Sequence, residues 1–250
     1  MTLATKASRL YDATLSLVYP QACAICAANV ESRDGGIACA ACWEHAQVFS
    51  GAETICWKCG AISQGKLADD KKEQVRCRRC DEDAFTAARA CGFYEGALRA
   101  CVLELKRKPQ VPARLVRLMS DASRRHPINE ATLVVPVPLH PERERERGFN
   151  QAAVLARALA QSRHLRCDEW SLARAIHTDR HRTGMDARSR RESVAGAFQV
   201  SRPRLIENES VLLVDDVFTT GATASACAAA LKNAGAKEVF VLTVARPQIY

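Results

Sequence analysis

The residues best suited to chemistry lie between positions 211 and 223, where the sequence runs VLLVDDVFTTGAT. Two adjacent carboxylates, Asp215 and Asp216, stand in the middle of this segment. A small, hydroxyl-rich run follows them and consists of Thr219, Thr220, Gly221, Ala222 and Thr223. Threonine hydroxyls and the N–H groups at a helix start donate hydrogen bonds to phosphate. Carboxylates accept hydrogen bonds from sugar hydroxyls, or offset the charge of Mg²⁺ on a polyphosphate. The segment therefore predicts an anion-binding loop beside two acids.

The elements that flank this loop must place it at the edge of a sheet. Residues 211–214 are apolar and rich in β-branched side chains, which predicts a strand buried on both faces that ends at the acidic pair. An alanine-rich helix is expected from Ala224 to Asn233, with Gly235 as its C-cap. Gly221 lets the backbone come close to a phosphate. Ligands of parallel α/β sheets bind at the carboxyl ends of the strands, which is where the acids fall.

These thirteen residues resemble, position for position, the phosphoribosyl-pyrophosphate (PRPP) motif of type I phosphoribosyltransferases. A P-loop is excluded by the missing G-K-[ST] ending, and a Rossmann loop by the missing G-x-G-x-x-G pattern. The resemblance implies that Asp215 and Asp216 hold the ribose hydroxyls of PRPP. It also implies that residues 219–223 hold the 5′-phosphate and that Mg²⁺ binds together with PRPP.

The cysteines predict a second kind of site. Eight of the twelve form four C-x-x-C pairs, which are Cys23/Cys26, Cys39/Cys42, Cys56/Cys59 and Cys77/Cys80. Two such pairs complete a tetrahedral Zn²⁺ site, so two structural zinc ions are expected. Sequential pairing places the first two pairs on one ion and the last two on the other, while an interleaved scheme stays open. The remaining cysteines, at positions 91, 101, 167 and 227, are expected to be small buried hydrophobes.

The rest of the chain predicts a large α/β domain behind a small metal-binding one. We expect an N-terminal helix and a double zinc ribbon in residues 1–84, and a phosphoribosyltransferase-like domain in residues 85–250. Strands are expected at 87–94, 132–137 and 238–244, besides 211–214, and helices at 96–108, 113–125 and 150–162. This alternation predicts a mostly parallel sheet flanked by helices. Residues 170–200 are expected to contain a hairpin that ends at 197–200.

The composition indicates which partners the protein binds and in which compartment it is located. The formal net charge of +8 favours polyanionic partners such as PRPP or nucleic acid. No apolar run reaches the roughly 18–20 residues that a membrane span needs. The N-terminal region lacks the apolar core of a signal peptide, because Asp12, Thr14 and Ser16 interrupt it. A cytoplasmic protein without a transmembrane segment is therefore expected, with a short amphipathic helix at residues 8–18.

The similarity to a known family extends beyond the PRPP motif. Residues 134–151 read VVPVPLHPERERERGFNQ, and residues 190–198 read RRESVAGAF. Together with the four C-x-x-C pairs, these segments resemble the ComF family of competence-associated proteins, which join a double zinc ribbon to a phosphoribosyltransferase-like domain. The resemblance implies a role in DNA uptake, with transfer of phosphoribosyl to an unknown nitrogen acceptor.

The family resemblance also implies roles for single residues. A pyrophosphate loop is expected at Val137, Pro138, Leu139 and His140. Because Pro138 has no N–H, the donors there would be the next two backbone N–H groups or nearby side chains. Arg147 is the best candidate for a catalytic contact. The run from 142 to 147 is otherwise expected to be a solvated face or a mobile loop.

Two further positions keep two interpretations each. Lys106 either reaches a phosphate or complements a helix dipole, and Asn150 either caps a helix or joins Gln151 at the pyrophosphate. Residues 180–191 correspond to the loop that closes over PRPP. Arg182 stands where the family pattern has glutamine and Ser193 where it has asparagine, which weakens any inference about the acceptor or loop closure.

A binding protein is the alternative to an enzyme. The chain would then sense PRPP or a nucleotide without catalysis, or bind single-stranded DNA together with proteins of the DNA-uptake machinery. The basic residues of the second ribbon, Lys71, Lys72, Arg76, Arg78 and Arg79, would supply the DNA contacts. Trp43 and Trp57 would either stack on bases or form the small cores of the ribbons.

Overall fold

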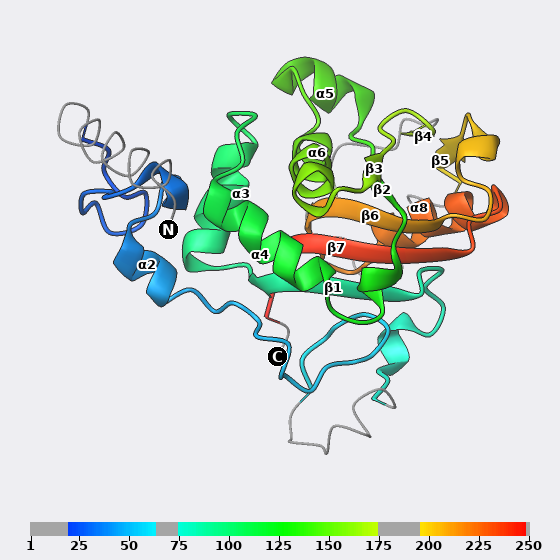
Figure 1. The fold of residues 1–250 in the computed structure, drawn as a ribbon, viewed down its shortest axis with the longest axis horizontal. Coiled ribbons are helices and arrows are strands. Elements are labelled where there is room, and N and C mark those ends of the chain that lie inside the picture. The colour runs from blue at the N-terminus through cyan, green and yellow to red at the C-terminus, as the bar shows by residue number, and fades with distance from the viewer. Residues whose placement is uncertain (1–19, 64–74, 175–195, 249–250) are drawn as a thin grey trace.

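The computed structural model describes residues 20–63, 75–174 and 196–248 (Figure 1). The expected N-terminal helix at 8–18, the expected closing loop at 180–191, and Lys71, Lys72 and Ser193 lie outside the described residues. Within the described ranges, no helix combines the length and apolar character that crossing a membrane requires.

A parallel sheet forms the centre of the molecule (Figure 1). Its strands stand in the order β1 (Ala87–Phe93), β7 (Glu238–Arg246), β6 (Ser210–Val217), β2 (Leu133–Pro136) and β3 (Arg166–Cys167). All of its pairings are parallel, with Val214 opposite Pro136 on one side and Leu242 on the other. Residues 211–214 are fully buried, as expected for a strand covered on both faces. The predicted α/β fold is therefore confirmed.

Helices cover both faces of the sheet (Figure 1). The helices α3 (Gly96–Leu105), α4 (Ala113–Ser123) and α6 (Gln151–Arg163) share one hydrophobic core. The helix α8 (Ala222–Asn233) belongs to a second core on the other face. The short helix α5 (Pro141–Arg147) follows β2, and β4 (Leu172–Arg174) pairs antiparallel with β5 (Phe198–Val200). The remaining elements are α2 (Ala40–Glu44) and the 3-10 turns η1 (Arg33–Gly35), η3 (Arg78–Cys80), η4 (Ile128–Glu130) and η5 (Pro203–Leu205).

Several element boundaries differ from those expected. Strand β6 continues through Asp215 and Asp216 to Val217, because these residues still pair with β7. Helix α8 begins at Ala222, two residues before the expected start. Residues 142–147 belong to helix α5, in which His140 is the N-cap, and residues 143–146 are exposed, so these charges form the expected solvated face and not the alternative, a mobile loop. The alternating charges form i,i+3 and i,i+4 neighbours on that helix.

The two zinc ribbons pack on opposite faces of the sheet. Cys23, Cys39 and Trp43 of the first ribbon belong to the core of α3, α4 and α6. Cys56 and Cys80 of the second ribbon belong to the core of α8. The segment between the ribbons runs along the free edge of β1, since its backbone hydrogen-bonds there at residues 91 and 93. This segment covers a strand edge that would otherwise be open to pairing with another chain.

Candidate functional site

The eight cysteines of the C-x-x-C pairs form two clusters with sequential pairing. In each cluster all four sulfur atoms lie within 4.8 Å of one another. The Cys23–Cys42 and Cys26–Cys39 sulfur pairs are 3.7 and 3.6 Å apart, and the Cys56–Cys80 and Cys59–Cys77 pairs are 3.6 and 3.5 Å apart. A disulfide would place two sulfurs at about 2.05 Å. Four thiolates around one Zn²⁺ at about 2.3 Å lie about 3.8 Å apart. The clusters therefore fit structural zinc, and the interleaved scheme is excluded.

The second ribbon is fitted closely against the sheet at Gly60. This residue has a φ of +67°, and a Cβ there would come within 2.5 Å of the carbonyl oxygen of Ala88 in β1. The backbone N–H of Ala88 donates in turn to the carbonyl of Lys58 at 2.6 Å. Only glycine combines this conformation with such a close approach. The metal-binding turn at residues 56–59 is thus held against the edge of the sheet.

The side chains of Asp215 and Asp216 point to opposite faces of the sheet. Side chains alternate along a strand, so Asp216 faces the helices α3 and α6 while Asp215 faces α8. The Asp216 carboxylate lies 3.1 Å from the Lys106 ammonium and 3.5 Å from the side-chain amide of Gln151. Burial raises the pKa of Asp215 well above its ordinary value, and the neighbouring negative charge of Asp216 raises it further. The pair thus contains one ion-paired carboxylate and one whose pKa is raised by burial and by its charged neighbour.

Two cations from different elements meet at Asp216. Lys106 directly follows α3, and Arg147 is the last residue of α5. The Arg147 guanidinium donates to the side-chain oxygen of Gln151, whose amide donates to Asp216. Burial lowers the pKa of Arg147, and the charge of Asp216 opposes that effect. The structure therefore brings together Lys106, Arg147 and Asp216, which are far apart in sequence, and leaves positive charge available for an anion.

The expected pyrophosphate loop, residues 137–140, is held to the start of α6 by Asn150. The side-chain N–H of Asn150 donates to the carbonyl of Val137 at 3.0 Å, and its oxygen accepts from the N–H of Ala152 at 3.0 Å. Asn150 is therefore a helix cap that also positions the loop. The buried imidazole of His140 accepts from the N–H of Glu142 at 3.3 Å. Pro138 and Leu139 stay partly exposed between these two fixed ends.

The threonine-rich loop ends at the N-terminus of α8. Gly221 adopts a φ of +80°, and a Cβ at this position would lie 2.8 Å from the Phe218 ring. The hydroxyl of Thr220 accepts from the N–H of Ala222 at 3.4 Å, while Thr219 is exposed. The first N–H groups of a twelve-residue helix thus follow the loop. A helix N-terminus with free donors attracts phosphate.

Contacts between this loop and the second ribbon were not anticipated from the sequence. Arg246, at the end of β7, donates to the carbonyl of Cys59 at 2.8 Å and lies 5.6 Å from the Phe218 ring centre. The N–H of Ala84 donates to the hydroxyl of Ser225 in α8 at 3.0 Å. The Arg246–Cys59 and Ala84–Ser225 partners are separated by more than a hundred residues, so no local pattern indicates these two contacts. The ribbon is in direct contact with the loop and its helix.

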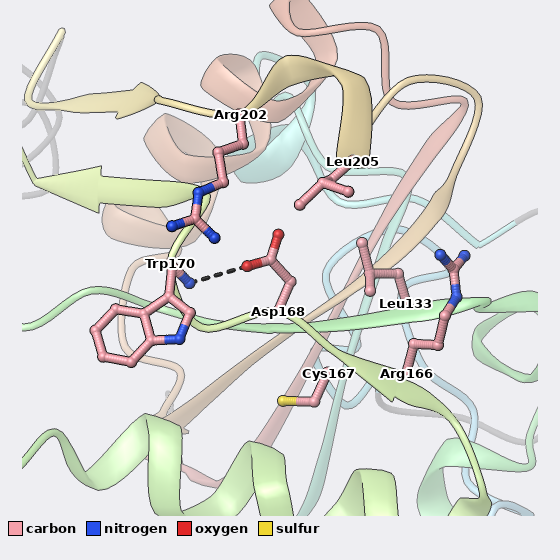
Figure 2. Close-up of a pocket in the computed structure, with 7 residues that line it drawn as sticks. All are labelled: Leu133, Arg166, Cys167, Asp168, Trp170, Arg202 and Leu205. Carbon is pink, nitrogen blue, oxygen red and sulfur yellow. Dashed lines mark hydrogen bonds between the residues drawn. The ribbon is translucent and has the colours of Figure 1, made fainter.

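A hollow lies beside the edge strand β3 (Figure 2). Its volume is about 410 Å³, and its lining includes Arg166, Asp168, Trp170 and Arg202. The Trp170 residue is 72% exposed. Asp168 accepts hydrogen bonds from the N–H groups of Trp170 and Ser171 through one carboxylate oxygen, and its other oxygen is buried without a partner. This surface therefore offers an exposed aromatic side chain beside the guanidinium of Arg202, while Arg166 lies at the other end of the hollow and pairs with Glu209 (Figure 2).

Comparisons with known proteins agree with both parts of the fold. A family model described as "Double zinc ribbon domain" matches residues 14–92, and one described as "Phosphoribosyl transferase domain" matches residues 146–249. Competence protein F of Haemophilus influenzae is 28% identical over 236 residues, which cover 90% of this chain and 96% of that protein. The DNA utilization protein YhgH of Escherichia coli (strain K12) is 26% identical over 238 residues, covering 92% and 99%.

Two more distant similarities complete the comparisons. Competence protein ComFC of Bacillus subtilis is 32% identical over 106 residues, which cover 41% of this chain and 39% of that protein. Among solved structures, the glutamine PRPP amidotransferase from B. subtilis gives a TM-score of 0.37 at 19% identity, covering 57% of this chain and 30% of that one. The structural similarity is too weak to support any conclusion about function.

The parallel sheet, the threonine-rich loop and the two cysteine clusters define a double zinc ribbon protein with a phosphoribosyltransferase domain. Competence protein F and the DNA utilization protein YhgH are similar to this chain over nearly their full length. The chain belongs to the ComF family, as its motifs indicate.

Proposed function

We propose that this protein binds PRPP with Mg²⁺ at the loop between β6 and α8 and transfers phosphoribosyl to a nitrogen acceptor. The observation that carries the proposal is the cluster of Lys106, Arg147, Gln151 and Asp216 at the end of β6, beside the threonine-rich loop. The match of residues 146–249 to a phosphoribosyltransferase domain supports it.

Each part of the site has a role in this reaction. The N–H groups of α8 and the hydroxyls of the threonine-rich loop hold the 5′-phosphate. Asp215 and Asp216 accept hydrogen bonds from the ribose hydroxyls. Lys106 and Arg147 place positive charge where the leaving pyrophosphate gains negative charge, and bound Mg²⁺ would neutralise part of the same charge.

The proposed transfer is balanced without any further reagent. The electron pair of the bond between C1 and oxygen leaves with pyrophosphate, and the lone pair of the acceptor nitrogen forms the new bond to C1. The proton of that nitrogen passes to solvent. Lys106 and Arg147 are therefore assigned to the leaving group, and no residue of this cluster needs to act as the base.

Calorimetry with PRPP and Mg²⁺ tests this proposal. We expect binding by the zinc-loaded wild type and its loss in the Asp215→Ala, Asp216→Ala double variant, because both ribose contacts disappear. Asp81 and Glu82 are also two consecutive acids, and both are exposed. Their double alanine variant is therefore the matched control, and it is expected to bind PRPP as the wild type does. A folded wild type that does not bind PRPP would refute the transferase proposal.

A second candidate function is binding of single-stranded DNA, and the exposed Trp170 favours it. Trp43 is buried, and the Trp57 ring lies 5.3 Å from the Arg89 guanidinium and 5.4 Å from the His126 ring. These ribbon tryptophans are packed, whereas Trp170 is exposed beside Arg202, in a hollow that Arg166 lines at its other end (Figure 2). Base stacking together with nearby positive charge is how many proteins hold single strands.

The names of the relatives support a role of this DNA binding in DNA uptake. Competence protein F and the DNA utilization protein YhgH are named for competence and for the use of DNA. We therefore propose that the chain takes part in DNA uptake in the cytoplasm, together with proteins of the uptake machinery. DNA would contact the β3 edge rather than the ribbon tryptophans.

Fluorescence titration with labelled oligo-dT tests the DNA proposal. Trp170→Ala is expected to weaken binding about tenfold, because stacking on one aromatic contributes roughly 1–3 kcal/mol per base. Arg78→Glu, Arg79→Glu reverses charge on the second ribbon, far in sequence from Trp170, and is expected to change affinity much less. The opposite ranking would place the DNA on the ribbon, and no salt-dependent binding by the wild type would remove this function.

A further inference from the structure

The carboxylate of Asp168 has one oxygen that lacks a hydrogen-bond partner among the residues that the structure describes. Its Oδ1 atom accepts from the backbone N–H groups of Trp170 at 2.9 Å and of Ser171 at 3.1 Å, and these two bonds fix the orientation of the carboxylate. The Oδ2 atom is buried and receives no donor. Because a buried polar atom without a partner is costly, this oxygen favours a ligand that brings an N–H or O–H donor.

Asp168 lines the hollow beside β3, and Figure 2 shows its free oxygen directed toward the space between Arg202 and Leu205. Both of these side chains are exposed. Exposed side chains change rotamer within picoseconds to nanoseconds, so a ligand reaches this oxygen by displacing them. The hollow has a volume of about 410 Å³. Clefts of roughly 300–1,000 Å³ hold small organic ligands, and one nucleobase with its sugar therefore fits.

The hollow presents an acceptor, a donor and an aromatic side chain to such a ligand. The acceptor is the Oδ2 atom of Asp168, and the donor is the guanidinium of Arg202. The aromatic side chain is Trp170, which is largely exposed. A nucleobase has the three complementary features, because it combines a flat face for stacking with donors and acceptors on its edge.

The free carboxylate oxygen distinguishes between the bases. Adenine, cytosine and guanine each carry an exocyclic amino group, which is a donor on the edge of the ring. Thymine has carbonyl groups instead, and its one ring N–H lies between two of them. Asp168 can accept from an amino group, whereas it would meet the carbonyl oxygens of thymine with its own negative charge. Arg202 can donate to the ring nitrogen or carbonyl beside the amino group.

We infer that the hollow beside β3 binds a nucleobase that carries an exocyclic amino group, and that Asp168 accepts a hydrogen bond from this group. The inference rests on the DNA-binding function proposed above and adds a base preference to it. Trp170 stacks on the ring and holds any base. Asp168 selects among the bases and is therefore the residue that determines specificity.

The ratio of the affinities for oligo-dC and oligo-dT tests the inference. Both are pyrimidine single strands of equal charge, and only cytosine carries the amino group. In fluorescence titrations with labelled oligomers of equal length, the wild type should bind oligo-dC about tenfold more tightly, which is the effect of one hydrogen bond to a charged group. Asp168→Asn should lose this preference. The asparagine oxygen keeps the two backbone bonds, so its NH₂ group replaces the free oxygen and donates to a thymine carbonyl instead.

Glu169→Gln is the matched control, because it removes the same charge at the next position. The Glu169 carboxylate pairs with Arg157 of α6 at 2.6 Å and lies outside the lining of the hollow. This variant should keep the wild-type ratio within about twofold, since the loss of a surface ion pair has a small effect.

Three results would overturn the base preference and leave the DNA-binding function standing. The wild type would bind oligo-dT as tightly as oligo-dC or more tightly, Asp168→Asn would keep the wild-type ratio, or Glu169→Gln would change the ratio as much as Asp168→Asn does. Absence of salt-dependent binding of both oligomers by the wild type would instead remove the DNA-binding function itself.

Discussion

Loss of the second zinc site is expected to destabilise the phosphoribosyltransferase domain as well as the ribbon. Two buried guanidinium groups depend on the folded ribbon: Arg89 donates to the carbonyl of Trp57, and Arg246 donates to the carbonyl of Cys59, each at 2.8 Å. Burial lowers the pKa of Arg89 to about 10 and also lowers that of Arg246. A hydrogen bond to a charged group contributes roughly 1.5–3 kcal/mol, so the loss of both is expected to destabilise the domain. Because the ribbon also shares the core of α8, its unfolding would expose that core.

Cys59→Ser is the variant that tests this expectation. We expect it to bind one zinc ion instead of two, to unfold at lower denaturant concentration and to lose PRPP binding, since Arg246 also contacts Phe218. Zinc content and urea unfolding followed by circular dichroism are the measurements. Cys167→Ser is the control, because Cys167 is exposed and outside both clusters, and it should change stability by less than about 0.5 kcal/mol. Unchanged unfolding of a one-zinc variant would show that the ribbon is energetically independent.

The features that the sequence predicted are those encoded by neighbouring residues. The buried strand, the acids and the loop at 211–223 lie on one continuous segment, and the C-x-x-C spacing is itself a local geometry. The order of strands and helices followed from hydrophobic periodicity. These local patterns were sufficient for the α/β fold and for the presence of two metal sites.

The features that were missed depend on distances across the fold. The pairing of the cysteines stayed open because spacing does not determine which turns meet. Cys167 was expected to be buried, and it is exposed because β3 is a short edge strand. The acids were expected just past the strand, but pairing of Asp215 with Thr243 extends β6 through them and directs them to opposite faces. The contact of Arg246 with the ribbon has no local signal at all.

Replacement of Lys106 by methionine is expected to weaken PRPP binding about ten- to a hundredfold, because hydrogen bonds to charged groups contribute roughly 1.5–3 kcal/mol. Lys106 lies 3.1 Å from Asp216, so its removal takes one cation from the pyrophosphate region and leaves Asp216 without its ion pair. Methionine keeps most of the apolar part of the side chain and removes the ammonium group with its charge and its donors. Lys108→Met is the matched control, since Lys108 lies just after α3, pairs with Glu104 of that helix at 3.0 Å and is largely exposed.

The same variant is expected to change the pH dependence of binding. Burial holds the pKa of Asp215 above its ordinary value, and the charge of Lys106 partly opposes this rise. The ligand-free fold therefore favours protonated Asp215, and this contribution to stability is present at low pH and lost as the pH rises through the folded pKa. If ribose binding requires the carboxylate, PRPP affinity should increase with pH over that range. In Lys106→Met the midpoint should move to higher pH, as calorimetric titrations at a series of pH values will measure. An unshifted midpoint together with weaker binding would mean that Lys106 acts on the phosphates alone.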